Sequence, residues 1–450
     1  MARDRGSPTG KGAAGRRVVA QVSRALQHRN YRLYFAGQGT SVVGTWITRV
    51  ATSWLVYRLT GSAALLGVVG FAGQVPAFVL APFAGVWIDR TNRRRLLVVT
   101  QALAMLQSLA LAILALSGTI AVWHVLALQL FQGCINAFDM PGRQSFLHEL
   151  VEDRADLPNA IALNSSMVNG ARLVGPTIAG LLIAATGEGW CFLLDAVSYL
   201  AVIGSLLAMR LPAHVVKGGG SRLLHDLRQG VHYAFAFLPI RAVLMLLALV
   251  CLTGVPYTVL MPVIAVTTLH GGPHTYGFLM GATGVGALVG AIYLASRTSV
   301  LGLGRIIPLA AILFGAGLIT FALSHSLAMS LFLLLFAGGG FMVLMAASNT
   351  LLQTLVREEM RGRVMAFYTM AFMGTTPFGS LVAGVLAERI GAPRTIMIGG
   401  AACLVGGAAF FGVLPAVRAM ARPVYVERGI LPAVTEGVSQ ASVLTGGLEQ

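Results

Sequence analysis

Four charged side chains lie within long apolar stretches of this 450-residue chain. Two are arginines and two are aspartates: Arg49, Arg172, Asp139 and Asp195. A charged side chain in the middle of a membrane helix costs about 2.5–3.5 kcal/mol on insertion scales, so it normally faces a protein or water-filled interior. Arginine keeps its proton at physiological pH, so each one must be stabilised by a carboxylate, by helix carbonyls, by water or by bound substrate. The chemistry that these residues favour is therefore binding.

A polar stripe leads up to one of the aspartates. Gln129, Gln132, Asn136 and Asp139 are separated by steps of three, four and three positions. Because an α-helix has about 3.6 residues per turn, these spacings place all four side chains on one helical face. That face borders either a wet cavity or a neighbouring helix, since polar residues in membrane bundles also form interhelical hydrogen bonds.

A second polar face carries Gln38 and Arg49, and the next apolar segment contributes Gln74. We expect these residues to line one cavity together with Arg172 and the stripe. Measured along their segments at about 1.5 Å per residue, Arg49 and Asp195 fall in the same half of the membrane. An unpartnered buried ion is strongly disfavoured, so we predict that Arg49 and Asp195 form a buried pair.

The elements that carry these residues are membrane helices. The chain is 56% hydrophobic and 11% charged, whereas about a quarter of the residues in soluble domains are charged. A span needs about 20 apolar residues, and the sequence contains a dozen apolar segments of about that length. They run at roughly 33–57, 64–88, 96–116, 123–142, 159–186, 190–210, 240–264, 275–296, 305–324, 328–352, 364–388 and 394–414.

The basic residues predict the topology. Nearly all of the 32 lysines and arginines fall at the ends of the chain or in alternate connections. Three, Arg58, Arg389 and Arg394, fall in the other connections. Positive charge accumulates on the cytoplasmic side, so we expect both termini there. The basic residues are scattered between apolar runs, which argues against a nucleic-acid-binding patch.

The longest hydrophilic connection divides the chain into two sets of six helices. The predicted parts are a basic arm (1–32), a first bundle (33–210), a linker with an amphipathic helix (211–239), a second bundle (240–414) and an unstructured tail (415–450). A shift of 204 positions brings Gly175 and Gly180 onto Gly379 and Gly384, which suggests a repeat. Internal repeats that flank a site at the bilayer midplane are typical of secondary transporters.

The connection after the second segment holds the most specific motif. Gly85 and Asp89-Arg90 are followed by Arg93, Arg94 and Arg95. This run resembles the signature Gly-x-x-x-Asp-Arg-x-Gly-Arg-Arg of the major facilitator superfamily, with Asn92 in place of a glycine. The resemblance implies a cytoplasmic gate in which Asp89 meets a helix N-terminus and a loop arginine, Arg93 or Arg94, pairs with Asp139.

The fifth segment carries Gly175-Pro176 and Gly180. It resembles the superfamily's antiporter motif Gly-x-x-x-Gly-Pro-x-x-Gly-Gly, with alanine at two glycine positions. Small residues let helices approach closely, and a proline bends its helix. The wider run 138–187 resembles the branch that includes bacterial enterobactin exporters. Gln129 stands where drug/proton antiporters of the superfamily usually carry arginine.

The resemblance implies an exporter of a small organic molecule, such as a siderophore, antibiotic or drug, in a bacterial cytoplasmic membrane. Proton antiport is what the family leads us to expect, and a major facilitator importer is the alternative. We expect a monomer in the lipid bilayer. We expect no cofactor or metal, because no phosphate-binding loop or zinc motif occurs. The four cysteines fall in four different segments and predict no disulfide framework. No residue pattern indicates an enzyme.

Overall fold

The computed structural model describes residues 24–151, 153–210, 223–297 and 299–431. All regular secondary structure in these residues is helical. Ten helical stretches among them are long and apolar enough to cross a membrane. The predicted arm lies outside the described residues up to position 23, and the predicted linker does so over 211–222.

The helices divide into two units by their contacts. Unit 1 contains the described residues up to 210 together with Met261–Gly284, and unit 2 contains the rest. The helices before position 211 are η1 (Arg24–Gln27), α2 (Arg29–Thr60), α3 (Ala63–Ala72), α4 (Val75–Asp89), α5 (Arg93–Leu116), α6 (Val122–Leu150), η2 (Arg154–Asp156), α7 (Leu157–Thr186) and α8 (Glu188–Ala208).

The chain after position 222 forms a comparable series. Its elements are α9 (Leu223–Ala236), α10 (Leu238–Thr253), α11 (Tyr257–Thr267), α12 (Pro273–Ala295), α13 (Leu303–Ala322), α14 (Leu327–Leu355), α15 (Glu358–Thr369), the π-helical turn η3 (Met370–Gly374), α16 (Thr375–Ile390) and α17 (Ala392–Glu427). The helix predicted in the linker is present as α9.

Local sequence signals explain where several helices begin and end. The Asn92 side chain caps α5, because its Oδ1 accepts a hydrogen bond from the backbone nitrogen of Arg95 at 3.1 Å. Thus the residue that departs from the signature glycine starts the next helix. Gly61 ends α2 in the left-handed conformation, with φ of 64°. Ser62 then caps α3 through the backbone nitrogen of Leu65.

Small residues position the helices of unit 1. A Cβ added to Gly180 would lie 2.7 Å from the carbonyl oxygen of Pro273 and 2.8 Å from the Cα of Gly277. Glycine at both positions therefore permits α7 to touch the first part of α12. This approach gives a physical reason why residues 261–284 group with unit 1, whereas the sequence placed them in the second bundle.

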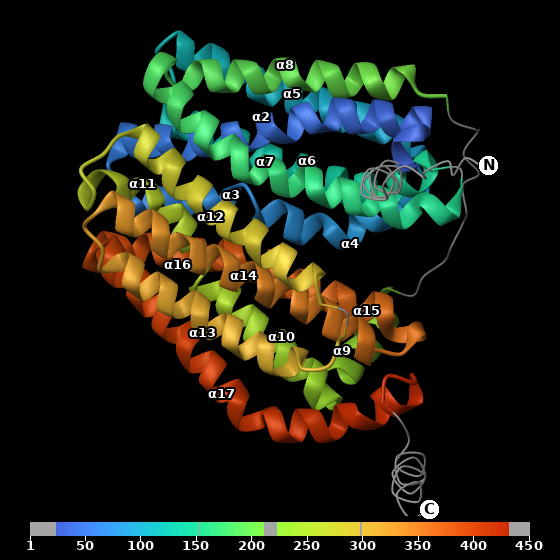
Figure 1. The fold of residues 1–450 in the computed structure, drawn as a ribbon. Helices are drawn as coiled ribbons and strands as arrows, with labels where there is room; N and C mark the ends of the chain where they lie inside the picture. Colours follow the sequence, from blue (N-terminus) through green and yellow to red (C-terminus); the bar gives the residue numbers. More distant parts are fainter. Residues whose placement is uncertain (1–23, 152, 211–222, 298, 432–450) are drawn as a thin grey trace, which may run out of the picture. The chain divides into compact units, whose positions relative to one another are not determined.

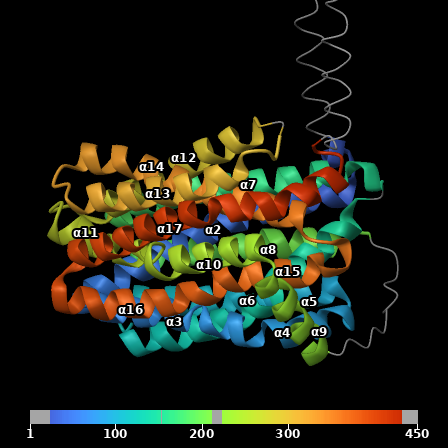
Figure 2. The same ribbon diagram turned by 90° about the horizontal axis from the view of Figure 1, so that it is seen from below.

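Figure 1 shows α2, α5, α7 and α8 running side by side. The α8 helix contacts the other three, and α7 also contacts α2. In unit 2, α13 packs against both α14 and α17, as the view in Figure 2 shows. Large fully buried side chains such as Phe192 in unit 1 and Phe314 in unit 2 fill the interiors. Each unit thus has an apolar core of its own.

The order of the helices supports the predicted repeat. Adding 204 to the bounds of α6 gives 326–354, and α14 spans Leu327–Leu355. The same shift carries α7 onto 361–390, which α15, η3 and α16 cover, and it carries the start of α8 onto 392, where α17 begins. The repeat therefore extends beyond the few matching glycines to whole helices.

The first part of the predicted tail differs from the expectation of an unstructured segment. Residues 415–427 continue α17 as helix, although Pro415 and Pro423 lie inside it. Val417 and Ala421 on this extension are buried, and Arg428 donates a hydrogen bond to the carbonyl oxygen of Val356 at 2.6 Å. These contacts stabilise an ordered segment. Residues 432–450 lie outside the described part.

Candidate functional site

Two arginines of unit 1 lie against one tryptophan. The Cζ atom of Arg49 lies 5.4 Å from the centroid of the Trp46 ring, and that of Arg172 lies 5.9 Å from it. Both distances are within the range of cation–π interactions. The side chain of Arg49 is accessible to solvent and that of Arg172 is half-buried. The arrangement places two positive charges beside an aromatic surface, which suits a planar or aromatic anion.

The α7 motif brings Arg172 to this tryptophan. A Cβ on Gly175 would lie only 2.6 Å from the Cβ of Trp46, so α7 and α2 can approach this closely only with glycine here. Arg172 precedes Gly175 by three residues, which places both on the same side of α7. The glycine that resembles the antiporter motif therefore positions a charged side chain as well as a helix. Pro176 and Gly180 follow on the same helix and are buried.

Aromatic side chains extend this region of unit 1. Trp54 stacks on Tyr276 with ring centroids 6.4 Å apart and an angle of 20° between the planes. Tyr276 is almost completely buried, and Trp54 lies on α2, eight positions after Trp46. The α2 helix thus combines aromatic surface, the Arg49 guanidinium and polar groups.

The stripe on α6 meets α2 at one end. Gln129 Nε2 donates a hydrogen bond to Thr52 Oγ1 at 3.3 Å, which joins the two polar faces. Gln132 Nε2 donates to Asn136 Oδ1 at 3.1 Å within α6, and both side chains are half-buried. Gln74, between α3 and α4, donates through Nε2 to the carbonyl oxygen of Gly70 in α3. The stripe therefore serves in part as interhelical contact, and its middle stays accessible.

The other end of the stripe is a buried ionic cluster. Asp139 forms an ion pair with Arg143, one turn later on α6. Its Oδ1 also accepts hydrogen bonds from Thr100 Oγ1 at 2.9 Å and from Gln101 Nε2 at 2.7 Å, both on α5. Gln38 from α2 lies in the same region, beside Gln101 and Arg143.

The predicted pairing of Asp139 with a loop arginine is wrong in this structure. Arg93 NH1 instead donates to Glu149 Oε1 at 2.5 Å. Arg94 NH2 donates to the carbonyl oxygen of Leu207 at 2.7 Å. The reason is distance along antiparallel helices: Glu149 lies ten residues beyond Asp139, or about 15 Å along α6, and so faces the start of α5.

Two gate residues lie at the end of α4, where only the backbone is described. Gly85 and Asp89 are both within α4, and their side-chain environment lies outside the described part. Arg90 follows the helix as its cap residue and is exposed. The proposed role of Asp89 therefore stays a prediction from the motif.

Asp195 and Arg49 do not form the predicted pair. Asp195 Oδ2 accepts a hydrogen bond from Ser108 on α5 at 2.8 Å. Its other oxygen faces Gly44, whose added Cβ would lie 2.6 Å from it. Gly44 and Arg49 are five positions apart, so they point about 140° apart around α2. Equal depth in the membrane did not place the two groups on the same face.

Three charged residues were missed as site partners by the sequence analysis. They are Arg143, Glu149 and Glu188, to which the sequence analysis assigned no role. The spacing of four positions between Asp139 and Arg143 is a signal that could have identified their pair. Glu188 accepts hydrogen bonds from Arg58 Nε at 2.7 Å and NH2 at 3.2 Å. No sequence signal connects those two residues, which are 130 positions apart.

The described residues contain no group of three or more histidines, cysteines or acids that could hold a metal ion. All four cysteines are free. The charged clusters of unit 1 are thus built from ion pairs, amides and hydroxyls. They can bind and orient a charged molecule.

The chain is similar in sequence to several known bacterial transporters. The chain is 25% identical over 370 residues to the staphyloferrin A transporter of Staphylococcus aureus, covering 82% of this chain and 92% of that protein. It is 28% identical to the multidrug efflux pump Tap of Mycolicibacterium fortuitum (80% and 89% covered). It is 22% identical to macrolide efflux protein A of Streptococcus pyogenes (83% and 94%).

Solved structures share the fold at low sequence identity. A bacterial homologue of the iron transporter ferroportin, in an inward-facing state, matches with a TM-score of 0.66 and 17% identity over 86% of this chain and 98% of that one. The nucleoside transporter NupG matches with a TM-score of 0.65 and 14% identity over 86% and 99%. The profile of the transmembrane secretion effector family matches residues 23–427. The chain therefore belongs to the transmembrane secretion effectors, a family of major facilitator transporters.

Proposed function

We propose that this protein is a secondary active transporter that exports a small organic anion from the cytoplasm. Relatives with efflux functions cover four fifths of the chain, which supports export of a small molecule. The observation that carries the choice of an anion is the pair of arginines on Trp46. Among the described residues Arg49 has no acidic partner, so its charge is available to a substrate.

The membrane arrangement is part of the proposal. Ten helical stretches in the described part of the chain are long and apolar enough to cross a membrane. We assign α2 and α6 as two further spans, which gives twelve. They have 32 and 29 residues, or more than about 40 Å each, against a hydrocarbon core of about 30 Å. Their polar faces lower their mean hydropathy. Twelve spans with both termini in the cytoplasm of a bacterium agree with the distribution of basic residues.

Export by alternating access needs an energy source, and we propose proton antiport. The chain contains no nucleotide-binding loop, and the α7 motif resembles that of antiporters. The aspartates inside the spans of unit 1 are the residues that can carry a proton. Collapsing the proton gradient with a protonophore should therefore stop transport, whereas depleting ATP at a constant gradient should not.

The direction of transport is tested with vesicles of both orientations. Everted membrane vesicles from cells that express the protein should accumulate an anionic dye when a proton gradient is applied, and intact cells should lose it. Uptake by intact cells would instead support the alternative function, an importer. Vesicles from cells that express no transporter provide the background.

The anion preference is tested at the two arginines. Arg49→Gln and Arg172→Gln should each reduce efflux of an anionic dye about tenfold, because a hydrogen bond to a charged group contributes about 1.5–3 kcal/mol. A neutral dye of similar size should be affected less. Arg241→Gln, at the exposed start of α10, is the matched control. Equal loss for both dyes with poor expression would assign the arginines to packing.

We also propose that Asp89 belongs to a cytoplasmic gate, as the motif implies. Asp89→Asn should reduce efflux severalfold while leaving membrane insertion intact, because one residue at a helix end does not determine the fold. The measurement is the efflux rate at matched protein levels. Wild-type efflux by a well-expressed Asp89→Asn protein would contradict the gate, and Asp153→Asn, an exposed acid in another connection, is the control.

A further inference from the structure

A cavity of about 640 Å³ lies within unit 2, and the arginines on Trp46 are not among the residues that line it. It is bordered by the end of α14, the start of α15, the connection between α12 and α13, and the end of α17. The predicted topology places these connections on the cytoplasmic side. Ligand sites typically have volumes of about 300–1,000 Å³, so the cavity has room for a small organic molecule or a lipid headgroup.

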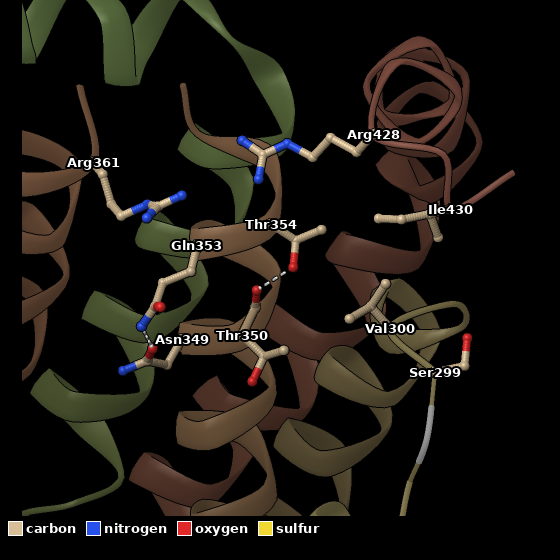
Figure 3. A pocket seen from close by; sticks show the side chains of 9 residues that line it. All are labelled: Ser299, Val300, Asn349, Thr350, Gln353, Thr354, Arg361, Arg428 and Ile430. Carbon is tan, nitrogen blue, oxygen red and sulfur yellow. Dashed lines mark hydrogen bonds between the residues drawn. The ribbon is translucent and has the colours of Figure 1, made fainter. Parts of the chain in front are cut away.

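Two arginines dominate the chemistry of the cavity. Figure 3 shows Arg361 and Arg428 approaching from opposite sides, with their guanidinium groups pointing toward one another above Gln353 and Thr354. The described residues that line the cavity include no aspartate or glutamate. Two guanidinium groups that converge without an acid between them repel one another. An anion between them would remove that repulsion.

The hydrogen bonds of the two arginines leave donors available. Arg428 uses NH2 to donate to the carbonyl oxygen of Val356 at 2.6 Å. Arg361 NH2 lies 3.5 Å from Glu358 Oε1, but that glutamate side chain is 82% exposed, so the pair is weak. Arg361 Nε is buried and has no hydrogen-bond partner among the described residues. A buried donor without an acceptor is unfavourable, and an anion would satisfy it.

Amides and hydroxyls complete the polar wall. Gln353 Nε2 donates to Asn349 Oδ1 at 2.5 Å, and the second hydrogen of that amide stays available. Thr354 Oγ1 donates to the carbonyl oxygen of Thr350 at 2.8 Å. Ile430 and Val300 form an apolar border on one side, as Figure 3 shows. The cavity therefore combines a cationic, hydrogen-bonding part with an apolar edge.

We propose that this cavity binds a phosphate group carried by an organic molecule. Arginine binds phosphate through two parallel hydrogen bonds, which a pair of converging guanidinium groups can supply from both sides. The source is either the headgroup of an anionic phospholipid or a soluble phosphate ester of the cytoplasm. By holding Arg428 and Arg361 together, the ligand fastens the end of α17 to the first turn of α15. This site is independent of the proposed transport substrate.

The test uses native mass spectrometry of the delipidated full-length protein in detergent. Each arm compares a compound that bears a phosphate with one that lacks it. The lipid arm uses phosphatidylglycerol and diacylglycerol, and the soluble arm uses glycerol 3-phosphate and glycerol. The double variant Arg361→Gln/Arg428→Gln should weaken binding of the phosphate-bearing member at least about tenfold. Arg418→Gln/Arg422→Gln removes the same charge from exposed positions of α17 outside the cavity and should leave binding unchanged.

The two arms identify the source of the phosphate. Loss of phosphatidylglycerol binding alone assigns a lipid headgroup, and loss of glycerol 3-phosphate binding alone assigns a soluble ester. Equal weakening in both double variants, or none in either, overturns the proposal. If the first double variant does not fold, Arg361→Lys/Arg428→Lys keeps the charge and removes the paired hydrogen bonds, and it should also weaken binding.

Discussion

The two halves of the repeat carry chemically different side chains at corresponding positions. The shift of 204 places Thr253 at the position of Arg49 and Thr376 at that of Arg172. Both threonines donate hydrogen bonds to carbonyl oxygens of their own helices, at 2.8 Å to Leu249 and at 2.6 Å to Phe372. The same backbone position thus carries a charge in one unit and a hydroxyl bonded within its helix in the other.

The difference extends to whole helices. Between residues 242 and 296, 306 and 356, 364 and 387, and 395 and 417, the sequence contains no lysine, arginine, aspartate or glutamate. The helices of unit 1 before position 211, by contrast, hold Arg49, Arg172, Asp139 and Asp195 well inside them. Packing through small residues is common to both, since a Cβ on Gly379 would clash with the carbonyl oxygen of Leu252, much as one on Gly175 would clash with Trp46. The repeat therefore preserves helix contacts, whereas polar chemistry is concentrated in unit 1.

The largest effect on stability is expected from a substitution that makes α6 resemble its equivalent, α14. The equivalent of Asp139 is Val343, and Asp139→Leu would leave Arg143 without its anion. Breaking a buried pair by removing one partner costs about 3–5 kcal/mol. Thermal unfolding of the purified protein should therefore show a strong loss of stability.

The double variant Asp139→Leu/Arg143→Leu provides the control for this change. Removing both charges together should recover most of the stability. A double variant as unstable as Asp139→Leu would show that the ion pair is not the reason, and Val343→Leu measures the cost of a leucine at the equivalent position.

A smaller effect is expected at the glycine contact that the two units share. Gly175→Val should destabilise unit 1 by about 1–3 kcal/mol, because the side chain overpacks the contact with Trp46. It should also lower efflux of the anionic dye by displacing Arg172. Gly170→Val is a matched control on the same helix, since a Cβ there meets nothing within 4 Å. Similar stability of the two variants would contradict the close approach of α7 and α2.

The smallest expected effect on the free energy of unfolding is that of replacing one of the two buried aspartates of unit 1 by asparagine. Asp195 accepts a hydrogen bond from the Ser108 hydroxyl, and Asp139 is paired with Arg143. An amide can also accept the serine hydrogen bond, so Asp195→Asn should change the free energy of unfolding by less than about 1 kcal/mol. Asp139→Asn should cost more, because it removes the charge that Arg143 requires. Denaturation of both variants in the same detergent gives the comparison, and equal costs would refute it.

Much of the fold could be predicted from apolar segments. The predicted segment 96–116 agrees with α5, and 159–186 agrees with α7. Other segments proved to be two helices, as at α3 and α4, which Gly73 and Gln74 separate. Hydropathy detects a continuous apolar run and does not register a break within it. The polar residue Gln74, two positions before Pro76, is a sequence signal of the break between α3 and α4.

The candidate site was harder to predict than the helices. Periodicity correctly placed Gln129 and Asp139 on a polar face that meets other helices. It could not determine which neighbour each residue meets, because that depends on how the helices pack. Asp139 forms an ion pair with Arg143 on its own helix, and Asp195 accepts a hydrogen bond from Ser108 on α5. Depth along a helix was a poor guide, since it ignores the direction in which a side chain points.

The length of α17 has a practical consequence for measuring motion. Its 36 residues would extend about 54 Å as a straight helix, well beyond a hydrocarbon core of about 30 Å. A cysteine introduced at exposed Arg422 would thus lie outside the lipid while remaining on a span of the transporter. A spectroscopic label there can report the movement of that span from the aqueous side.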